Sequence, residues 1–237
     1  MKIDILTLFP SMFEGPFDTS MLKKTKDNGL VEINIHNLRD WASDKHKTVD
    51  DRPFGGGKGM VLRVDVVHRA ISNLQFPIYK KKEGRIVLLS PQGKVFNQKK
   101  AVELSRLNHI IFIAGHYEGF DERISQHLVD EEISIGDYIL TGGEIPAMVL
   151  VDSIVRLIPG VLKEEVTTHE SFSQIENGKL KIENLLDHPS YTRPEKYLGW
   201  EVPKVLLGGN HKEIEIWRKK ASLAKTKKVR PDLLESK

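Results

Sequence analysis

The sequence predicts an α/β protein built on a mostly parallel sheet with helices on its faces. Segments with strand patterning alternate with segments of helical periodicity, and three strand segments in succession run into turns that contain Gly or Pro. With 237 residues the chain can form one large or two modest domains. Its composition, 39% hydrophobic and 29% charged, argues against disorder or a fibrous repeat.

The first part of the chain alternates strands with a loop and a helix. Residues 2–8 and 30–36 alternate apolar with polar side chains, which predicts two strands. Residues 40–60 lack apolar periodicity and end in four glycines, which predicts a long loop of the kind that is usually functional. Residues 61–74 carry apolar side chains at helical spacing, which predicts an amphipathic helix.

The next part repeats a strand–turn–helix unit. Strands are expected at 85–89, 109–114 and 132–135, turns or loops at 91–97, 115–119 and 136–143, and helices at 98–107, 121–128 and 144–157. The strand at 109–114 is almost continuously apolar, as expected where both faces of a strand are buried.

After Pro159-Gly160 the sequence becomes polar and loses its apolar periodicity, which predicts a domain boundary. We expect a first domain over residues 1–160, a polar linker over 161–183 and a small, helical, basic domain over 184–237. The last domain contains a predicted helix at 212–225. The apolar side chains expected on one side of that helix are Ile214, Trp217 and Leu223.

Positive charge gathers at the C-terminal end. Residues 211–237 carry nine Lys and Arg against four Asp and Glu, a net charge of +5, which leaves −2 for the other 210 residues of a chain whose total is +3. This asymmetry indicates a polyanionic partner such as nucleic acid, and a solvated helix with a basic end is the alternative interpretation.

Several classes of function are excluded or disfavoured. Because the chain has no cysteine, it has no disulfide, no thiol nucleophile and no cysteine-ligated metal. Nine scattered histidines form no H-E-x-x-H pattern, so no metal site is predicted, and P-loop and G-x-S-x-G motifs are absent from the sequence. The N-terminus lacks a signal-peptide pattern and no stretch is long enough to span a membrane, so a soluble cytoplasmic protein is expected.

The three glycine-containing turns are the candidate ligand site. They comprise residues 88–93, 114–119 and 134–143, each at the end of a predicted strand. In parallel sheets, ligands bind outside the carboxyl ends of the strands, and glycine lets the backbone approach a ligand closely. These loops could hold a purine and a sugar through backbone hydrogen bonds, or they could simply turn the chain.

Several long motifs carry a resemblance to a known family. They are DILTLFPSMF, HKTVDDRPFGGGKGM, LLSPQG, AGHYEGFDER, SIGDYILTGGE, RLIPGVL, HPSYTRP and GNHKEIEIWR. With these motifs, which run nearly end to end, the chain resembles the bacterial tRNA (guanine-N1)-methyltransferase family, TrmD, of the SPOUT superfamily. The resemblance implies methyl transfer from S-adenosylmethionine to N1 of the guanosine 3′ to the anticodon (position 37) in tRNA. It also implies a SPOUT-type sheet with a deep trefoil knot, and a homodimer with its active site at the subunit interface.

The resemblance assigns the three loops to the methyl donor, with Glu118 and Tyr138 lining the pocket. The donor-binding residues that it implies are Leu88, Leu89, Ser90, Pro91, Gln92, Gly93, Gly115, Tyr117, Glu118, Gly119, Ser134, Ile135, Gly136, Asp137, Tyr138, Ile139, Leu140, Gly142, Gly143 and Pro146. Family members depend on Mg²⁺, so a magnesium ion is a further candidate cofactor, although the sequence shows no ligand set for it.

The resemblance also implies two catalytic residues, Arg156 and Glu170. The family usually has Asp-Ser-Phe where this chain has Glu170-Ser171-Phe172, so the carboxylate of the general base lies one methylene further out. We expect Glu170 to be the base, with Asp187 as the alternative. From the residues alone, Arg156 would be a cation at a helix C-terminus and Glu170 a solvated linker charge.

For RNA, the resemblance and the charge pattern imply contacts from the glycine-rich loop and from the C-terminal domain. The candidates are Arg52, Lys58, Arg193, His211 and Arg218. Three alternative functions are a related SPOUT enzyme that methylates ribose or ribosomal RNA, a catalytically silent RNA-binding protein that keeps the fold, and a small-molecule binder, which the positive charge of the C-terminal part disfavours. The intact SIGDYILTGGE loop argues against the silent protein, and the GNH…WR tail argues against the ribose or ribosomal RNA enzyme.

Overall fold

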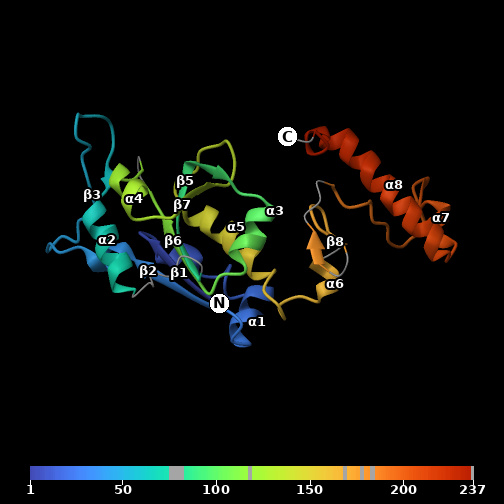
Figure 1. Cartoon of the computed structure of the whole chain (residues 1–237), viewed down its shortest axis with the longest axis horizontal. Helices are drawn as coiled ribbons and strands as arrows, with labels where there is room; N and C mark the ends of the chain where they lie inside the picture. The colour runs from blue at the N-terminus through green and yellow to red at the C-terminus, as the bar shows by residue number, and fades with distance from the viewer. Residues whose placement is uncertain (75–82, 117–118, 168–169, 177–178, 182–184, 236–237) are drawn as a thin grey trace. The chain divides into compact units, whose positions relative to one another are not determined.

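The chain forms two compact units in this computed structural model. It describes residues 1–74, 83–116, 119–167, 170–176, 179–181 and 185–235, with the backbone alone at 164–165, 174–176 and 179–181. Unit 1 comprises Met1–Leu162 and unit 2 comprises Lys163–Lys237 (Figure 1). The segment expected to be a linker begins unit 2 and contains secondary structure: α6 (Glu164–Thr167), β8 (Gln174–Glu176) and β9 (Lys179–Lys181).

Unit 1 is built on a five-stranded parallel sheet, which confirms the predicted fold class. The strands are β1 (Lys2–Thr7), β2 (Glu32–Asn37), β5 (Gly84–Val95), β6 (His109–Ala114) and β7 (Glu131–Ser134). Their order is β2-β1-β6-β5-β7, and every neighbouring pair is parallel. The trefoil knot that the resemblance implies stays a prediction.

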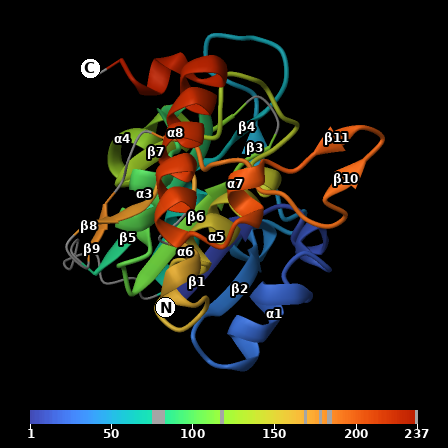
Figure 2. The ribbon, with the colours of Figure 1, turned by 90° about the vertical axis from the view of Figure 1, so that its right-hand side faces the viewer.

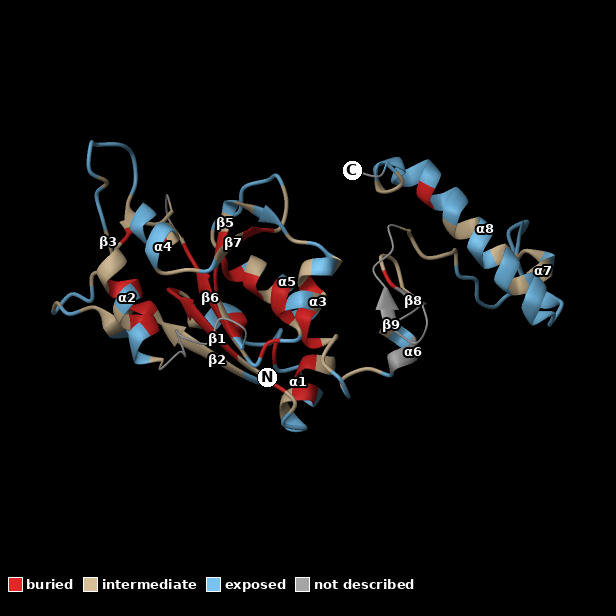
Figure 3. Ribbon diagram, in the orientation of Figure 1, coloured by how far each residue is buried: buried red, intermediate tan, exposed pale blue. Residues whose placement is uncertain are grey.

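Alternating side chains of the inner strands build a core on each face of this sheet. Ile3 and Ile5 of β1 join the cluster that α1 (Ser20–Asp27), α3 (Gln98–Leu104) and α5 (Glu144–Val155) cover. Leu6 joins the cluster on the other face, with α2 (Val64–Asn73) and α4 (Glu122–His127). Figure 3 shows the buried residues on the strands and on the inner sides of α2 and α5. Because both faces are covered, the inner strands are apolar on both sides.

Shorter elements complete unit 1. They are η1 (Pro10–Phe13), η2 (Leu38–Trp41), β3 (Asp50–Asp51) and β4 (Val61–Leu62). The helix expected at 61–74 begins only at Val64, because residues 61–62 form the strand β4, and the expected loop at 40–60 includes β3, which pairs with β4.

The predicted turn at 91–97 is wrong, because β5 continues through Pro91 to Val95. Both Leu89 and Lys94 pair with Ile133 of β7, so the register shifts between them. The residues between those two pairs bulge out of the ladder without ending the strand. These residues include Pro91 and Gly93, which indicated a turn in the sequence.

Unit 2 is organised around a long helix, α8 (His211–Val229), capped by the Asn210 side chain, which accepts from the amide of Glu213 at 3.4 Å. Before it come β10 (Lys196–Tyr197), β11 (Trp200–Glu201) and α7 (Lys204–Leu207), and after it comes η3 (Pro231–Leu233). Figure 2 shows β10 and β11 as a two-stranded arm.

The inner side of α8 agrees with the predicted one only in part: Trp217 contacts the rings of His188 and Tyr191 at centroid distances of 6.4 Å and 6.3 Å. Thr226 is fully buried, whereas Leu223, expected on the apolar side, is 39% exposed. Thr226 Oγ1 accepts a hydrogen bond from the Leu186 amide at 3.0 Å, and Ser222 Oγ donates to the Leu186 carbonyl at 2.6 Å. The helix thus packs against an irregular segment through hydroxyl groups, a contact that apolar periodicity does not reveal.

Candidate active site

A cavity of about 360 Å³ lies where the three predicted glycine-containing loops meet: the bulge within β5 between Leu89 and Lys94, and the loops that follow β6 and β7. This volume falls within the range of about 300–1,000 Å³ that small-molecule sites usually have. The residues that line it are Leu88, Leu89, Ser90, Pro91, Gln92, Gly115, His116, Gly119, Phe120, Asp121, Glu122, Ser125, Glu132, Ile133, Ser134, Ile135, Gly136, Tyr138, Ile139, Leu140, Thr141, Gly142, Gly143 and Pro146. The loops therefore converge on a single hollow, as expected for a ligand site.

Most of the residues expected to bind the donor line this cavity. Gly93 and Asp137 do not line it, and Tyr117 and Glu118 lie outside the described residues. The sequence reasoning missed a group of lining residues, most of them on or beside α4 and β7: His116, Phe120, Asp121, Glu122, Ser125, Glu132, Ile133 and Thr141. His116 and Thr141 lie inside the glycine loops themselves, so their positions in those motifs were the available signal.

Close backbone packing explains two of the glycines. A Cβ on Gly143 would lie 2.8 Å from the Cα of Ala114, and a Cβ on Gly93 would lie 2.5 Å from the backbone of Glu132. The Gly143 amide donates to the Gly115 carbonyl at 2.7 Å. Gly93 thus has a packing role beside the cavity, and Gly143 joins two of its loops.

The loop after β7 is held by a serine and a tyrosine. Ser134 Oγ donates to the Gly136 carbonyl at 3.0 Å and accepts from the Gly136 amide at 3.1 Å. The Tyr138 hydroxyl donates to the Ile135 carbonyl at 3.3 Å. These contacts fix the backbone of the loop and leave Ile139 79% exposed beside the cavity.

Acidic side chains give one part of the cavity a negative charge. Asp121, Glu122 and Glu132 line it, and no Lys or Arg occurs among the described lining residues. Arg123 donates to Asp121 from Nε at 2.8 Å, and this hydrogen bond lowers the pKa of the Asp121 carboxyl from its ordinary value. A cavity with this charge favours a positively charged ligand.

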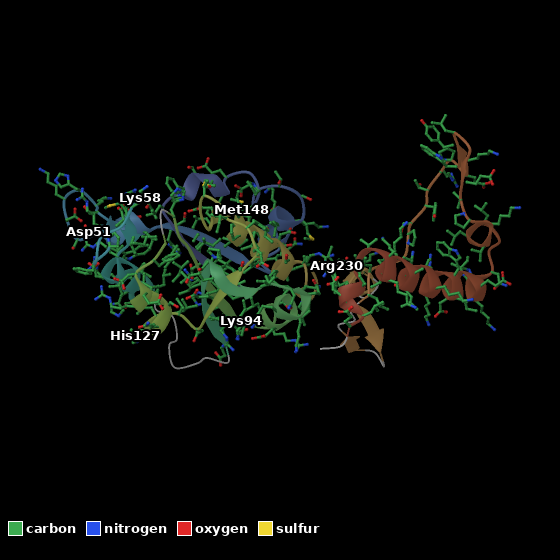
Figure 4. All side chains as sticks on the ribbon, turned by 90° about the horizontal axis from the view of Figure 1, so that it is seen from above. Asp51, Lys58, Lys94, His127, Met148 and Arg230 are labelled. Atoms are coloured by element: carbon green, nitrogen blue, oxygen red, sulfur yellow. The ribbon has the colours of Figure 1, made fainter. Side chains whose placement is uncertain are left out.

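The strand β4, which follows the glycine-rich loop, is hydrogen-bonded to the segment at Gly119 and Asp121 that lines the cavity. Leu62 of β4 donates its amide to the Gly119 carbonyl at 3.0 Å and accepts from the Asp121 amide at 3.0 Å. Arg52 and Lys58 are both exposed on this loop. Asp51 and Lys58, labelled in Figure 4, lie at the same end of unit 1.

The two candidate catalytic residues belong to different units. Arg156 follows α5 in unit 1, is partly exposed, and donates its amide to the Asp152 carbonyl at 3.3 Å. Glu170 lies in unit 2 and is also partly exposed. That these two residues act at one site is a prediction.

Within unit 2, the two candidate bases lie on segments that are hydrogen-bonded to each other. The Phe172 amide donates to the Leu185 carbonyl at 2.8 Å, and the Asp187 amide donates to Ser171 Oγ at 2.9 Å. Glu170 is therefore adjacent in the chain to a residue that contacts Asp187, although seventeen positions separate the two candidate bases in the sequence.

The remaining RNA candidates, Arg193, His211 and Arg218, are exposed in unit 2. His211 is the first residue of α8, and Arg218 lies on the same helix, whose last turn carries Lys227 and Lys228. These positions leave the cations accessible to a polyanion.

A parallel α/β sheet with a glycine-lined cavity at the carboxyl ends of its strands defines a class of proteins that bind nucleotide-like ligands at that edge. The family model described as tRNA (Guanine-1)-methyltransferase TrmD matches residues 1–236. The chain belongs to this family.

Curated relatives agree with the family assignment. A protein from Carboxydothermus hydrogenoformans is 54% identical over 99% of this chain and 88% of its own length. A protein from Dictyoglomus turgidum is 52% identical over 99% of this chain and 90% of its own length, and one from Bacillus pumilus is 53% identical over 100% and 93%. Each of the three is named tRNA (guanine-N(1)-)-methyltransferase.

Proposed function

We propose that this protein transfers a methyl group from S-adenosylmethionine to N1 of the guanosine 3′ to the anticodon, position 37, in tRNA. The observation that carries the proposal is the cavity of three glycine-containing loops in a chain of the TrmD family. We further propose that it acts in the cytoplasm, where tRNA is modified. No helix in the described part of the chain is long and apolar enough to cross a membrane.

The residues of the cavity suit this donor. S-adenosylmethionine supplies an electrophilic methyl group on a positively charged sulfur. Asp121, Glu122 and Glu132 give the cavity the complementary charge. The loops at Gly115 and Gly143, joined by a 2.7 Å hydrogen bond, bring backbone atoms to the wall. A rigid backbone cradle of this kind aligns the donor with its acceptor, and positioning is a large part of catalysis.

Glu170 is the proposed general base. Guanine N1 carries a proton at neutral pH and is a poor nucleophile, so the proton has to leave as the methyl group arrives. A carboxylate within hydrogen-bond reach takes that proton and contributes on the order of 10²–10⁴-fold to the rate. The segment next to Glu170 is held by the Phe172 amide, which donates to the Leu185 carbonyl at 2.8 Å, and by Ser171 Oγ, which accepts from the Asp187 amide at 2.9 Å.

Arg156 is proposed to stabilise the charge that the proton leaves behind. Loss of the N1 proton moves negative charge onto O6 of guanine, and a guanidinium placed there acts as an oxyanion hole does. Arginine suits this role because it stays charged and presents a planar pair of donors.

The RNA would be held by exposed cations on both units. Arg218 on α8 would meet phosphates, which makes affinity fall with salt. Arg52, Lys58, Arg193 and His211 would hold the unpaired anticodon loop, since sequence-specific RNA recognition concentrates in single-stranded loops.

We propose a homodimer with the active site at the subunit interface. Ile145 and Val149 lie one helical turn apart on α5 and are 47% and 41% exposed. Tyr138, Ile139 and Leu140 of the neighbouring loop are also exposed, by 54%, 79% and 37%. A second copy of the chain would cover this apolar surface at the edge of the cavity.

The described side chains offer no ligand set for the Mg²⁺ ion that the family resemblance implies. Among the described residues, no group of three or more His, Cys, Asp or Glu side chains could hold a metal ion.

The direct experiment supplies the purified protein with S-adenosylmethionine labelled in its methyl group and a tRNA transcript with G at position 37. We expect 1-methylguanosine at that position after nuclease digestion and mass spectrometry. A transcript with A at position 37 is the matched control and should stay unmodified. Label on a ribose, or equal label in both transcripts, would refute the proposal.

A further inference from the structure

A buried carboxylate lies beside the cavity without lining it. Glu144, the first residue of α5, is 1% exposed, and its Oε1 accepts a hydrogen bond from the hydroxyl of the fully buried Thr7 at 2.7 Å. The position at the helix N-terminus favours a negative charge. Burial of a carboxylate is costly unless its oxygens are paired and hydrogen-bonded, so the second oxygen calls for a donor.

That second oxygen points to a histidine of the cavity wall. Glu144 Oε2 has no hydrogen-bond partner among the residues that the structure describes, and His116 Nδ1 lies 3.9 Å from it. A Cβ on Gly142 would lie 2.3 Å from Oε2 and 2.6 Å from Nδ1. The carboxylate and the imidazole therefore share a confined space that a glycine keeps open.

The His116 ring is oriented by its surroundings. Nδ1 is buried, whereas the side chain as a whole is 26% exposed and lines the cavity. The Phe9 ring contacts the imidazole with centroids 4.7 Å apart. The Phe9 amide donates to Thr7 Oγ1 at 2.9 Å, which connects the residue packed on the ring to the residue that holds the carboxylate.

We propose that Glu144 is a positioning residue that keeps His116 protonated on Nδ1, so that Nε2 accepts a hydrogen bond from a hydroxyl or amino group of the methyl donor. A carboxylate next to one imidazole nitrogen fixes the tautomer and leaves the other nitrogen as an acceptor. The identity of the ligand rests on the proposed function, whereas the tautomer of His116 does not.

The first test measures the tautomer without ligand. In ¹⁵N-histidine NMR spectra at about pH 8, where an ordinary histidine is neutral, we expect the His116 Nδ1 signal to be of the protonated type and the Nε2 signal of the unprotonated type. The His116→Ala variant assigns these signals by their loss. Protonation of Nε2 instead of Nδ1 in the wild-type protein would overturn the proposal, whatever the variants do.

The second part of this test uses Glu144→Gln. The amide oxygen can still accept from Thr7, and its NH₂ group then faces Nδ1 and favours the opposite tautomer. We expect the two ¹⁵N signals to exchange their types. Glu103→Gln is the matched control, because Glu103 is exposed on α3 and its partner is Lys100, 2.8 Å away. Unchanged His116 signals in a folded Glu144→Gln protein would contradict the proposal.

The last test measures affinity for S-adenosylmethionine by calorimetry. We expect Glu144→Gln and His116→Ala each to weaken binding about fivefold to tenfold, the effect of one hydrogen bond. The double variant should bind as weakly as His116→Ala alone, since both changes remove the same contact. Fully additive losses, or no loss in His116→Ala, would overturn the proposal.

The same titration with 5′-methylthioadenosine, which keeps the ribose and lacks the amino acid, identifies the group that His116 binds. An equal loss in His116→Ala assigns a ribose hydroxyl or the adenine amino group, and a loss seen only with the full donor assigns the amino group of the amino acid part. If the wild-type protein binds neither ligand, the proposed function fails while the tautomer test still stands.

Discussion

Asp4 lies in the middle of β1 with no exposed surface and keeps its charge through four partners. His109 Nε2 and His36 Nε2 lie 2.5 Å and 2.8 Å from its oxygens, Asn34 Nδ2 donates at 3.2 Å, and Lys2 Nζ lies at 3.4 Å. Burial alone would raise the pKa of the Asp4 carboxyl. The two histidines, the lysine and the asparagine outweigh it and hold that pKa well below its ordinary value.

This lowered pKa sets the sign of a pH dependence. Because the folded-state pKa lies below the unfolded value, the stability that Asp4 contributes is present above about pH 4 and is lost as the pH falls through the folded pKa. We expect Asp4→Asn to lower the free energy of unfolding by about 2–4 kcal/mol at pH 7. The difference from wild type should shrink below about pH 3. Urea unfolding at several pH values measures it, and a constant difference down to pH 2 would contradict the assignment.

Single substitutions also distinguish Glu170 from Asp187 as the general base. We expect Glu170→Gln to lower single-turnover methyl transfer by about 10²–10⁴-fold, because it removes the base and keeps the shape. Affinity for the donor should not change. Asp187→Asn is the comparison, since its neighbour Ser171 connects it to the same segment. A nearly full rate in Glu170→Gln with a large loss in Asp187→Asn would transfer the role to Asp187.

The sequence pattern predicted helices and strands correctly where a single feature, such as a continuous apolar run, marked the element. The continuous apolar run of β6 predicted its bounds, His109–Ala114, because both its neighbours and both covering layers bury it. Pro91 and Gly93 indicated a turn, yet β5 continues past them because a register shift absorbs the irregularity. The helix α1 was not predicted, since only Leu22 and Thr25 of its residues are buried.

The sequence predicted most of the cavity-lining residues that lie in the three glycine-containing loops. Asp121 and Glu122 were missed as lining residues because they are ordinary charged residues at the start of α4, and only the tertiary packing brings them to the cavity. Glu144 has the sequence pattern of a common first-turn acid of a helix. Its burial depends on Thr7, which is 137 positions away.

Gly143 offers a test at the scale of the loops. A methyl group there would meet the Ala114 Cα at 2.8 Å, a backbone contact that cannot rotate away. We expect Gly143→Ala to destabilise the protein by about 1–3 kcal/mol and to weaken donor binding. Gly199→Ala in the β10–β11 turn is a control, because no atom lies within 4 Å of its added Cβ, although its φ of +87° adds some strain. Donor affinity in Gly143→Ala equal to that of wild type would show that the loops are not packed this tightly.

At the scale of the whole molecule, the proposed dimer depends on the exposed apolar side of α5. We expect Val149→Asp to convert a wild-type dimer into a monomer, because a charge would be buried at the interface without a partner. Analytical ultracentrifugation measures the change. Val229→Asp is a matched control, since Val229 is 59% exposed on α8. A monomeric wild-type protein, or a dimer that survives Val149→Asp, would place the interface elsewhere or remove it.

The cavity formed by the three glycine-containing loops is the proposed site of the methyl donor. Thr141 is exposed and lines that cavity, so Thr141→Trp would fill it without disturbing the core. Equilibrium dialysis with labelled S-adenosylmethionine measures donor binding at this cavity, with Arg218→Ala on α8 as the control. We expect the wild-type protein and Arg218→Ala to bind with equal affinity and Thr141→Trp to lose at least about tenfold, equivalent to about 1.4 kcal/mol. Undiminished binding by a folded Thr141→Trp protein would contradict the account.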